Sequence, residues 1–178
     1  NIYVFTGIDF FSKRAYGLAL NSKKSVYLLE KFKSLLFRNP LFPKYMIFDN
    51  APEFCAIRRY CETNKIQIRS SPPRHPSTNG ACENLNRTLK SRLRARCNFF
   101  NWDQFLDEVL HEINSSVHSV TKLTPFTIET GVGSPHSFYD HNWRQYDSKL
   151  EINFDKIKIN LDSEKQKRLD TFKNSNFV

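Results

Sequence analysis

The sequence is short of acidic residues and lacks the usual marks of secreted, membrane-spanning and zinc-binding proteins. No apolar run could span a bilayer, and no basic region and cleavage site of a signal peptide opens the chain. The four cysteines form no C-x-x-C pair and have no His at zinc spacing, which argues against a zinc site or a disulfide framework. We therefore expect an intracellular protein with reduced thiols. The chain begins with Asn rather than Met, so we also expect a piece of a longer protein.

Basic residues dominate the charge of the chain. Lys and Arg number 27 against 18 Asp and Glu, which gives a formal net charge of +9. Such an excess favours a polyanionic partner, most simply nucleic acid, although a membrane surface would also attract it. The 178 residues include 16 Phe, 7 Tyr and 2 Trp, enough bulky apolar side chains to fill the core of one domain.

The hydrophobic pattern predicts a mixed α/β domain followed by a helical tail. Two antiparallel strands and a long helix come first, and a strand, a helix, another strand and further helices follow: 3–9, 14–20, 23–37, 45–48, 50–63, 66–70, 80–97, 102–117 and the stretch TPFTIETG. This order indicates helices that cover a mixed sheet. From residue 146 the charges alternate and aromatic residues thin out, so we expect a domain over 1–145 and a linker helix within 146–178.

The stretch HPSTNGACENLNRTLKSRLRARC, residues 75–97, predicts a polar loop that passes into a helix at Gly80. On a helical period Leu85, Leu89 and Leu93 share an apolar stripe with two cysteines, and Glu83 shares another face with cations. Those cations are Arg87, Lys90 and Arg94. The simplest explanation is that Glu83 benefits from the helix N-terminus and pairs with Arg87, the other cations being solvated. The alternative is an acid that acts beside a phosphate-binding surface.

Asp49 is the second carboxylate of interest, because it follows the strand 45–48 directly. A sheet edge could bring it to Glu83, and the two would supply the hard oxygen ligands that Mg²⁺ or Mn²⁺ requires. A pair of such ions can activate an attacking oxygen and stabilise a leaving oxygen at phosphorus. The other interpretation of Asp49 is a turn-forming residue.

Four motifs occur in a specific order: GIDFFSKRA, IFDNAPEF, HPSTNGACENLNRTLK and HSVTKLTPF. In this order they resemble the integrase catalytic core of gypsy-type long-terminal-repeat retrotransposons and retroviruses, over about residues 3–131. The resemblance implies a ribonuclease H-like fold and a DDE carboxylate triad that binds two Mg²⁺ or Mn²⁺. It also implies 3′-end processing and strand transfer of element DNA into target DNA by a homo-oligomer. The protein would then be nuclear during integration.

The resemblance carries over residue by residue. Asp49 matches the second catalytic Asp and Glu83 the catalytic Glu, so both are the expected metal ligands. The expected DNA-binding residues lie in the active-site loop, where Gly80 also falls, and on the helix after it: Asn79, Asn86, Arg87, Lys90 and Arg94. Two departures stand out: the interval between the two carboxylates is slightly short, and Ser77 stands where relatives usually have Gln.

The first catalytic Asp is harder to place. Asp9 ends an apolar strand, but the motif IDFFSKRA in relatives lies on the second strand of the fold, after the catalytic Asp. A ribonuclease H-like sheet also opens with three antiparallel strands, and only two precede the helix at 23–37. We therefore expect the first strand and its Asp to be missing, Asp9 to close a hairpin with Ser12, and the chain alone to be inactive.

Two alternatives remain open. The chain could be a degenerate or domesticated integrase-derived domain that binds nucleic acid or protein without catalysis. It could also be a ribonuclease H-like nuclease, although the loop HPSTNG resembles integrases specifically.

Overall fold

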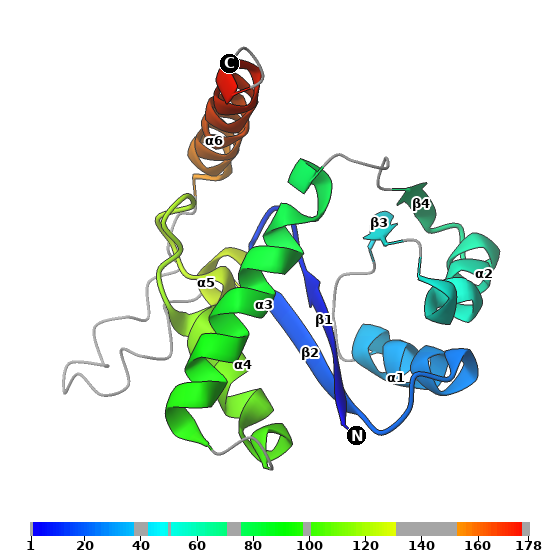
Figure 1. Cartoon of the computed structure of the whole chain (residues 1–178). Helices are drawn as coiled ribbons and strands as arrows, with labels where there is room; N and C mark the ends of the chain where they lie inside the picture. Colours follow the sequence, from blue (N-terminus) through cyan, green and yellow to red (C-terminus); the bar gives the residue numbers. More distant parts are fainter. Residues whose placement is uncertain are drawn as a thin grey trace. The chain divides into compact units, whose positions relative to one another are not determined.

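The computed structural model describes residues 2–37, 43–49, 51–70, 76–97, 101–130 and 153–175 (Figure 1). The chain divides into two compact units, residues 1–6 with 17–86 and residues 7–16 with 87–178. Three elements continue from one unit into the other: β1 (Tyr3–Ile8), β2 (Ala15–Leu20) and α3 (Pro76–Arg96). No helix of the described ranges is long and apolar enough to cross a membrane.

The first unit alternates helices and strands. Its further elements are α1 (Ser25–Phe37), β3 (Tyr45–Phe48), the 3₁₀ turn η1 (Pro52–Phe54), α2 (Cys55–Thr63) and β4 (Gln67–Ser70). β3 and β4 pair in parallel with Tyr45 opposite Gln67, and β1 pairs with β2. The sequence pattern predicted each of these elements to within a few residues at its ends. The mixed α/β composition is the one expected.

The core of the first unit forms where α1 and α2 face the strands. Phe32 of α1 is only 1% exposed and meets the rings of Phe5, Phe48 and Tyr60 at centroid distances of 6.2–6.4 Å. Ile57 and Cys61 of α2 are completely buried against the same cluster. Aromatic rings that meet edge to face gain contact energy beyond the area they bury, so Phe32 anchors this unit.

The second unit is mainly helical. It contains η2 (Trp102–Phe105), α4 (Leu106–Ser115), α5 (Pro125–Thr130) and the tail helix α6 (Phe154–Ser175). Asn114 of α4 ties down the start of β2, because its side chain accepts from the N–H of Ala15 and donates to the carbonyl of the same residue. Thr124 caps α5 by accepting the N–H of Thr127 at 3.0 Å, ahead of a proline at the first helical position. The tail helix is present as predicted, but residue 146, where the composition changes, lies outside the described ranges.

The start of α3 differs from the prediction. We expected a loop to Asn79 and a helix from Gly80, but α3 begins at Pro76, so both residues lie within the helix. Proline is well suited to the first helical position, because its fixed φ matches the helix and its missing N–H is not needed there. Once Leu85 and Leu89 are buried, the polar residues after Pro76 can extend the helix toward its N-terminus.

Candidate active site and nucleic-acid interface

Asp49 lies directly after β3, where the sequence placed it, and its side chain is exposed. Its Oδ1 accepts the N–H of Ala51 at 3.2 Å, which is the bond of a turn-forming Asp. The guanidinium of Arg58 on α2 donates to the carbonyl of Asp49 at 2.6 Å and lies over the ring of Phe48. An ionised carboxylate accepts about four hydrogen bonds, so the turn does not exhaust this group as a metal ligand. No sequence pattern predicted this contact of Arg58 at the end of β3.

Glu83 lies on α3 with its side chain exposed, in the same unit as Asp49. Because α3 begins at Pro76, Glu83 stands about two turns inside the helix, not in its first turn as expected. The favourable field of a helix N-terminus falls off within the first turn, so it does not explain this carboxylate. Among the ion pairs of the described residues, none joins Glu83 to Arg87. Neither the helix N-terminus nor an ion pair with Arg87 therefore explains why a carboxylate stands at this position.

Asn86, one turn after Glu83, contacts β1. Its Oδ1 accepts a hydrogen bond from the hydroxyl of Thr6 at 2.8 Å, between residues 80 positions apart in the chain. The amide nitrogen carries two further donors, so the bond is compatible with the predicted DNA contact. Asn79 lies in α3, and its predicted DNA contact remains a prediction.

The cations of α3 separate into two groups. Arg87, Lys90 and Arg94, here called the basic ladder, are exposed, whereas Leu85, Leu89 and Leu93 are buried. The apolar stripe predicted from the helical period is therefore confirmed for its leucines, whereas its two cysteines are half-buried.

The second group is formed by Arg92 and Arg96, here called the paired arginines. Arg96 binds Glu108 of α4 at 3.0 Å and also pairs with Glu112, and Arg92 lies 3.6 Å from Glu112. Their charge is therefore already compensated by carboxylates of the second unit.

Asp9 closes the hairpin between β1 and β2. Its Oδ2 accepts from the N–H of Phe11 at 3.0 Å, from the N–H of Ser12 at 2.6 Å and from the hydroxyl of Ser12 at 2.8 Å. Lys13 completes the turn in the left-handed region with φ 65°, and its N–H donates to the carbonyl of Asp9. The predicted turn role of Asp9 is therefore observed in its contacts.

The donor chemistry of Asp49 and Glu83 suits a hard divalent cation. Both are carboxylates with exposed side chains, the ligand type and access that Mg²⁺ and Mn²⁺ prefer. Across the described ranges, no three His, Cys, Asp or Glu side chains gather closely enough to hold a metal ion. The two carboxylates are therefore of the chemical type that such an ion prefers, and their joint binding of one ion remains a prediction.

Next to Arg14, the second unit holds a half-buried cluster. Arg14 and Tyr16 both bind the carboxylate of Glu129 on α5, whose side chain is largely buried. Burial, together with the negative charge of Glu129, raises the pKa of Tyr16 well above its ordinary value. The cluster joins the end of the hairpin to α5, and no site residue predicted from the sequence belongs to it.

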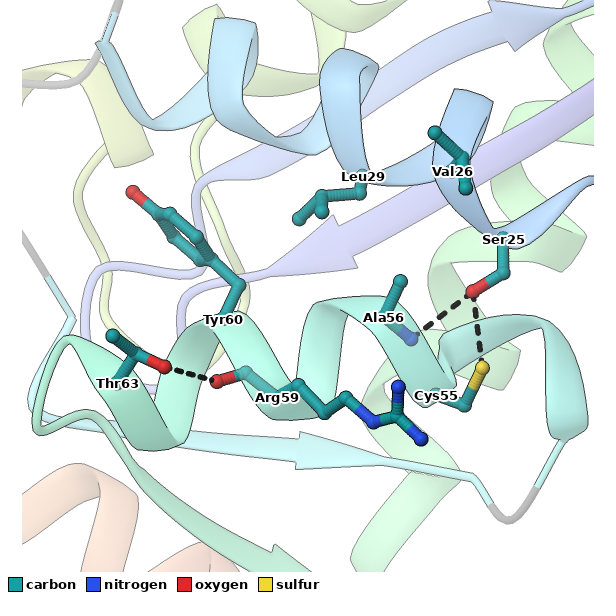
Figure 2. Close-up of a pocket in the computed structure, with 8 residues that line it drawn as sticks. All are labelled: Ser25, Val26, Leu29, Cys55, Ala56, Arg59, Tyr60 and Thr63. Carbon is teal, nitrogen blue, oxygen red and sulfur yellow. Dashed lines mark hydrogen bonds between the residues drawn. The ribbon is translucent and has the colours of Figure 1, made fainter.

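A surface groove of about 410 Å³ lies between α1 and α2 and contains none of the predicted site residues (Figure 2). The hydroxyl of Ser25 accepts the N–H of Ala56 at 3.0 Å and lies 3.2 Å from the thiol of Cys55. These bonds join the first turns of the two helices. The groove is thus a packing feature of the first unit, separate from the carboxylates.

Comparison with known proteins supports the resemblance found in the motifs. No protein-family profile matches the chain. The Tf2-3 and Tf2-4 transposon polyproteins of Schizosaccharomyces pombe are each 26% identical to it over 133 residues, which cover 70% of this chain. The chain spans about a tenth of the length of these curated relatives.

Three solved structures of similar fold come from retroviruses. The catalytic core domain of BIV integrase has a TM-score of 0.59 and 22% identity, covering 76% of this chain and 89% of that one. The HTLV-2 integrase catalytic core domain in complex with magnesium, in a trimeric form, has a TM-score of 0.57 and 16% identity, covering 72% of this chain and 92% of that one. A simian T-cell lymphotropic virus intasome in complex with PP2A regulatory subunit B56 gamma has a TM-score of 0.61 and 18% identity, covering 71% of this chain and 48% of that one. The chain thus has the ribonuclease H-like fold of integrase catalytic cores, and its resemblance to an integrase core of a long-terminal-repeat retroelement is confirmed.

Proposed function

We propose that the chain is part of an integrase that carries out metal-dependent 3′-end processing and strand transfer of element DNA. The observation that carries this proposal is the arrangement of α3: an exposed Glu83 precedes exposed cations while the opposite stripe is buried. Neither a helix-terminus effect nor an ion pair with Arg87 accounts for that carboxylate. Multimer formation and a nuclear location during integration belong to the same proposal.

In this proposal Asp49 and Glu83 hold a divalent ion, Mg²⁺ or Mn²⁺. When bound, the ion supplies Lewis-acid stabilisation of charge at the scissile phosphate. The basic ladder holds the DNA backbone beside Glu83, and such contacts position a duplex without reading its bases. Asp9 is left out of the ligand set, because its carboxylate already accepts three hydrogen bonds from the hairpin turn.

The first test is a titration of the chain with Mn²⁺, in which electron paramagnetic resonance measures the concentration of free Mn²⁺. Asp49→Asn and Glu83→Gln should each weaken Mn²⁺ binding about tenfold or more, since each removes a charged ligand. Glu30→Gln is the matched control, because Glu30 is an exposed acid on α1 of the same unit. Equal affinity in all four proteins would refute the metal site.

The same variants separate an enzyme from a binding domain. One outcome is that the DNA affinity is the same with and without Mn²⁺ and that Asp49→Asn changes neither value. The chain would then act as an integrase-derived DNA-binding domain. If Mn²⁺ strengthens DNA binding in the parent but not in Asp49→Asn or Glu83→Gln, the carboxylates and the DNA share one site. The second outcome is the one we expect.

A further inference from the structure

The bond between Thr6 and Asn86 joins two elements that carry different parts of the first unit. Thr6 lies in β1, which pairs with β2, and Asn86 lies one turn beyond Glu83 on α3. Both side chains are half-buried. A hydrogen bond that is partly shielded from water is electrostatically stronger than an exposed one, so this contact can hold the helix.

The hydrogen bond between Thr6 and Asn86 gives α3 a directional restraint that its apolar contacts do not provide. Leu85 and Leu89 are buried and fix which face of the helix points inward, but apolar contact is non-directional and restrains the exact rotation about the helix axis only coarsely. A hydrogen bond has a preferred distance and angle, so it also fixes rotation. Residues three apart are neighbours on a helix surface, so fixing Asn86 fixes the direction in which Glu83 projects.

The helix is weak on the other side of Glu83. Gly80 lies one turn before it, and glycine in a helix costs about 1 kcal/mol relative to alanine. A Cβ at Gly80 would have no atom within 4 Å, so packing does not require glycine there. The hydrogen bond of Asn86 thus holds α3 on the side of Glu83 away from this glycine.

We propose that Asn86 is a positioning residue: through the hydroxyl of Thr6 it fixes the rotation of α3 and so the place of the Glu83 carboxylate relative to Asp49. The inference rests on the proposed function, in which these two carboxylates hold one divalent ion. Thr6 holds the Asn86 side chain in place by donating a hydrogen bond to its Oδ1.

The first test is amide hydrogen exchange, which does not depend on metal. Thr6→Val removes the donor and keeps the shape, and Thr6→Ser keeps the donor. Losing one hydrogen bond should speed exchange in residues 83–89 about three- to tenfold in Thr6→Val and leave it nearly unchanged in Thr6→Ser. Thr63→Val is the control: it removes a hydroxyl that donates to the carbonyl of Arg59 within α2. Unchanged exchange in α3, or an equal rise in α1 and α2, would overturn the proposal.

The second test measures Mn²⁺ affinity, which a merely structural bond would not alter. Thr6→Val should weaken Mn²⁺ binding about threefold or more, whereas Thr6→Ser and Thr63→Val should match the parent. Adding Gly80→Ala to Thr6→Val should restore part of the loss by stiffening the helix.

The two tests separate the possible failures. Faster exchange with unchanged Mn²⁺ affinity, in a protein whose affinity depends on Asp49, would show that the bond is structural only and overturn the positioning role. If Asp49→Asn and Glu83→Gln leave Mn²⁺ affinity unchanged, the proposed function fails, and the positioning role fails with it. In that case the exchange data still decide whether Thr6 and Asn86 hold α3.

Discussion

Neutralising the basic ladder should remove a defined part of the salt dependence of DNA binding. The test is a comparison of two pairs of cations on α3: Arg87→Gln with Lys90→Gln, and Arg92→Gln with Arg96→Gln. Both double variants lose the same formal charge from the same helix. They differ because the paired arginines bind carboxylates of α4, whereas Arg87 and Lys90 are exposed and take part in none of the ion pairs among the described residues.

The expected size follows from counterion release. Each phosphate contact contributes about 0.9 to the slope of log affinity against log salt, so losing two contacts lowers the slope by about 1.8. Between about 50 and 200 mM salt the parent should then lose affinity by roughly twelvefold more than the ladder variant. The paired arginines are already neutralised by Glu108 and Glu112, so their variant should keep a slope close to that of the parent.

The assay is fluorescence anisotropy of a labelled duplex of arbitrary sequence, at a series of NaCl concentrations. Circular dichroism on each variant checks that α3 remains folded. Equal slopes for the parent and the ladder variant would show that the ladder is only a solvated face. An equal loss in both double variants would show that total charge, and not the exposed side of α3, determines the affinity.

Three further predictions concern residues outside the proposed site. Asp9→Ala should lower the free energy of unfolding by roughly 1–3 kcal/mol, because the hairpin loses its acceptor for Ser12. The Mn²⁺ affinity should stay unchanged. Urea unfolding measures the first effect and the Mn²⁺ titration the second. Burial, and then the charge of Glu62, raises the pKa of the Cys61 thiol to about 11 from 9.0. The stability that this group contributes is complete below pH 9 and is lost as the pH rises toward 11, so unfolding free energies of the parent should fall over that window more steeply than those of Cys61→Ala. Leu89→Ala should cost about 2–5 kcal/mol by thermal unfolding, since Leu89 is only 2% exposed; a cost near zero would mean that the stripe of α3 is not packed.

The sequence predicted most elements because their signals are local. The period of 3.6 in 25–37 and 82–97 comes from side chains that face a core, and the structure buries the leucines and the Phe32 ring that follow it. The strand 3–8 was predictable from its aromatic and β-branched residues, of which Tyr3 and Phe5 pack against the core. The turn at Asp9 was also predictable, since Asp followed by Ser is a common way to close a hairpin. Asp49 at the end of β3 followed from the strand pattern alone.

Other features depend on contacts between distant residues and left little trace in the sequence. Thr6 and Asn86 are 80 positions apart, and neither type suggests the other. The start of α3 was misplaced because Ser77, Thr78 and Asn79 favour turns in isolation, whereas burial of the leucine stripe pays for one more helical turn. The bond from Arg58 to the carbonyl of Asp49 required the geometry of α2 relative to β3.

The period of the α-helix could have separated the basic ladder of α3 from the paired arginines, which composition alone does not distinguish. Each residue turns a helix by about 100°, so Arg92 lies about 180° from Glu83, whereas Arg87 and Lys90 lie within about 40° of it. Arg96, four residues after Arg92, shares the side of Arg92, and both bind acids of α4. A basic helix can therefore use one side to bind a neighbouring helix and keep another side exposed. In this chain the exposed side is the one that carries Glu83, and in the proposed function its cations hold a phosphate backbone near that carboxylate.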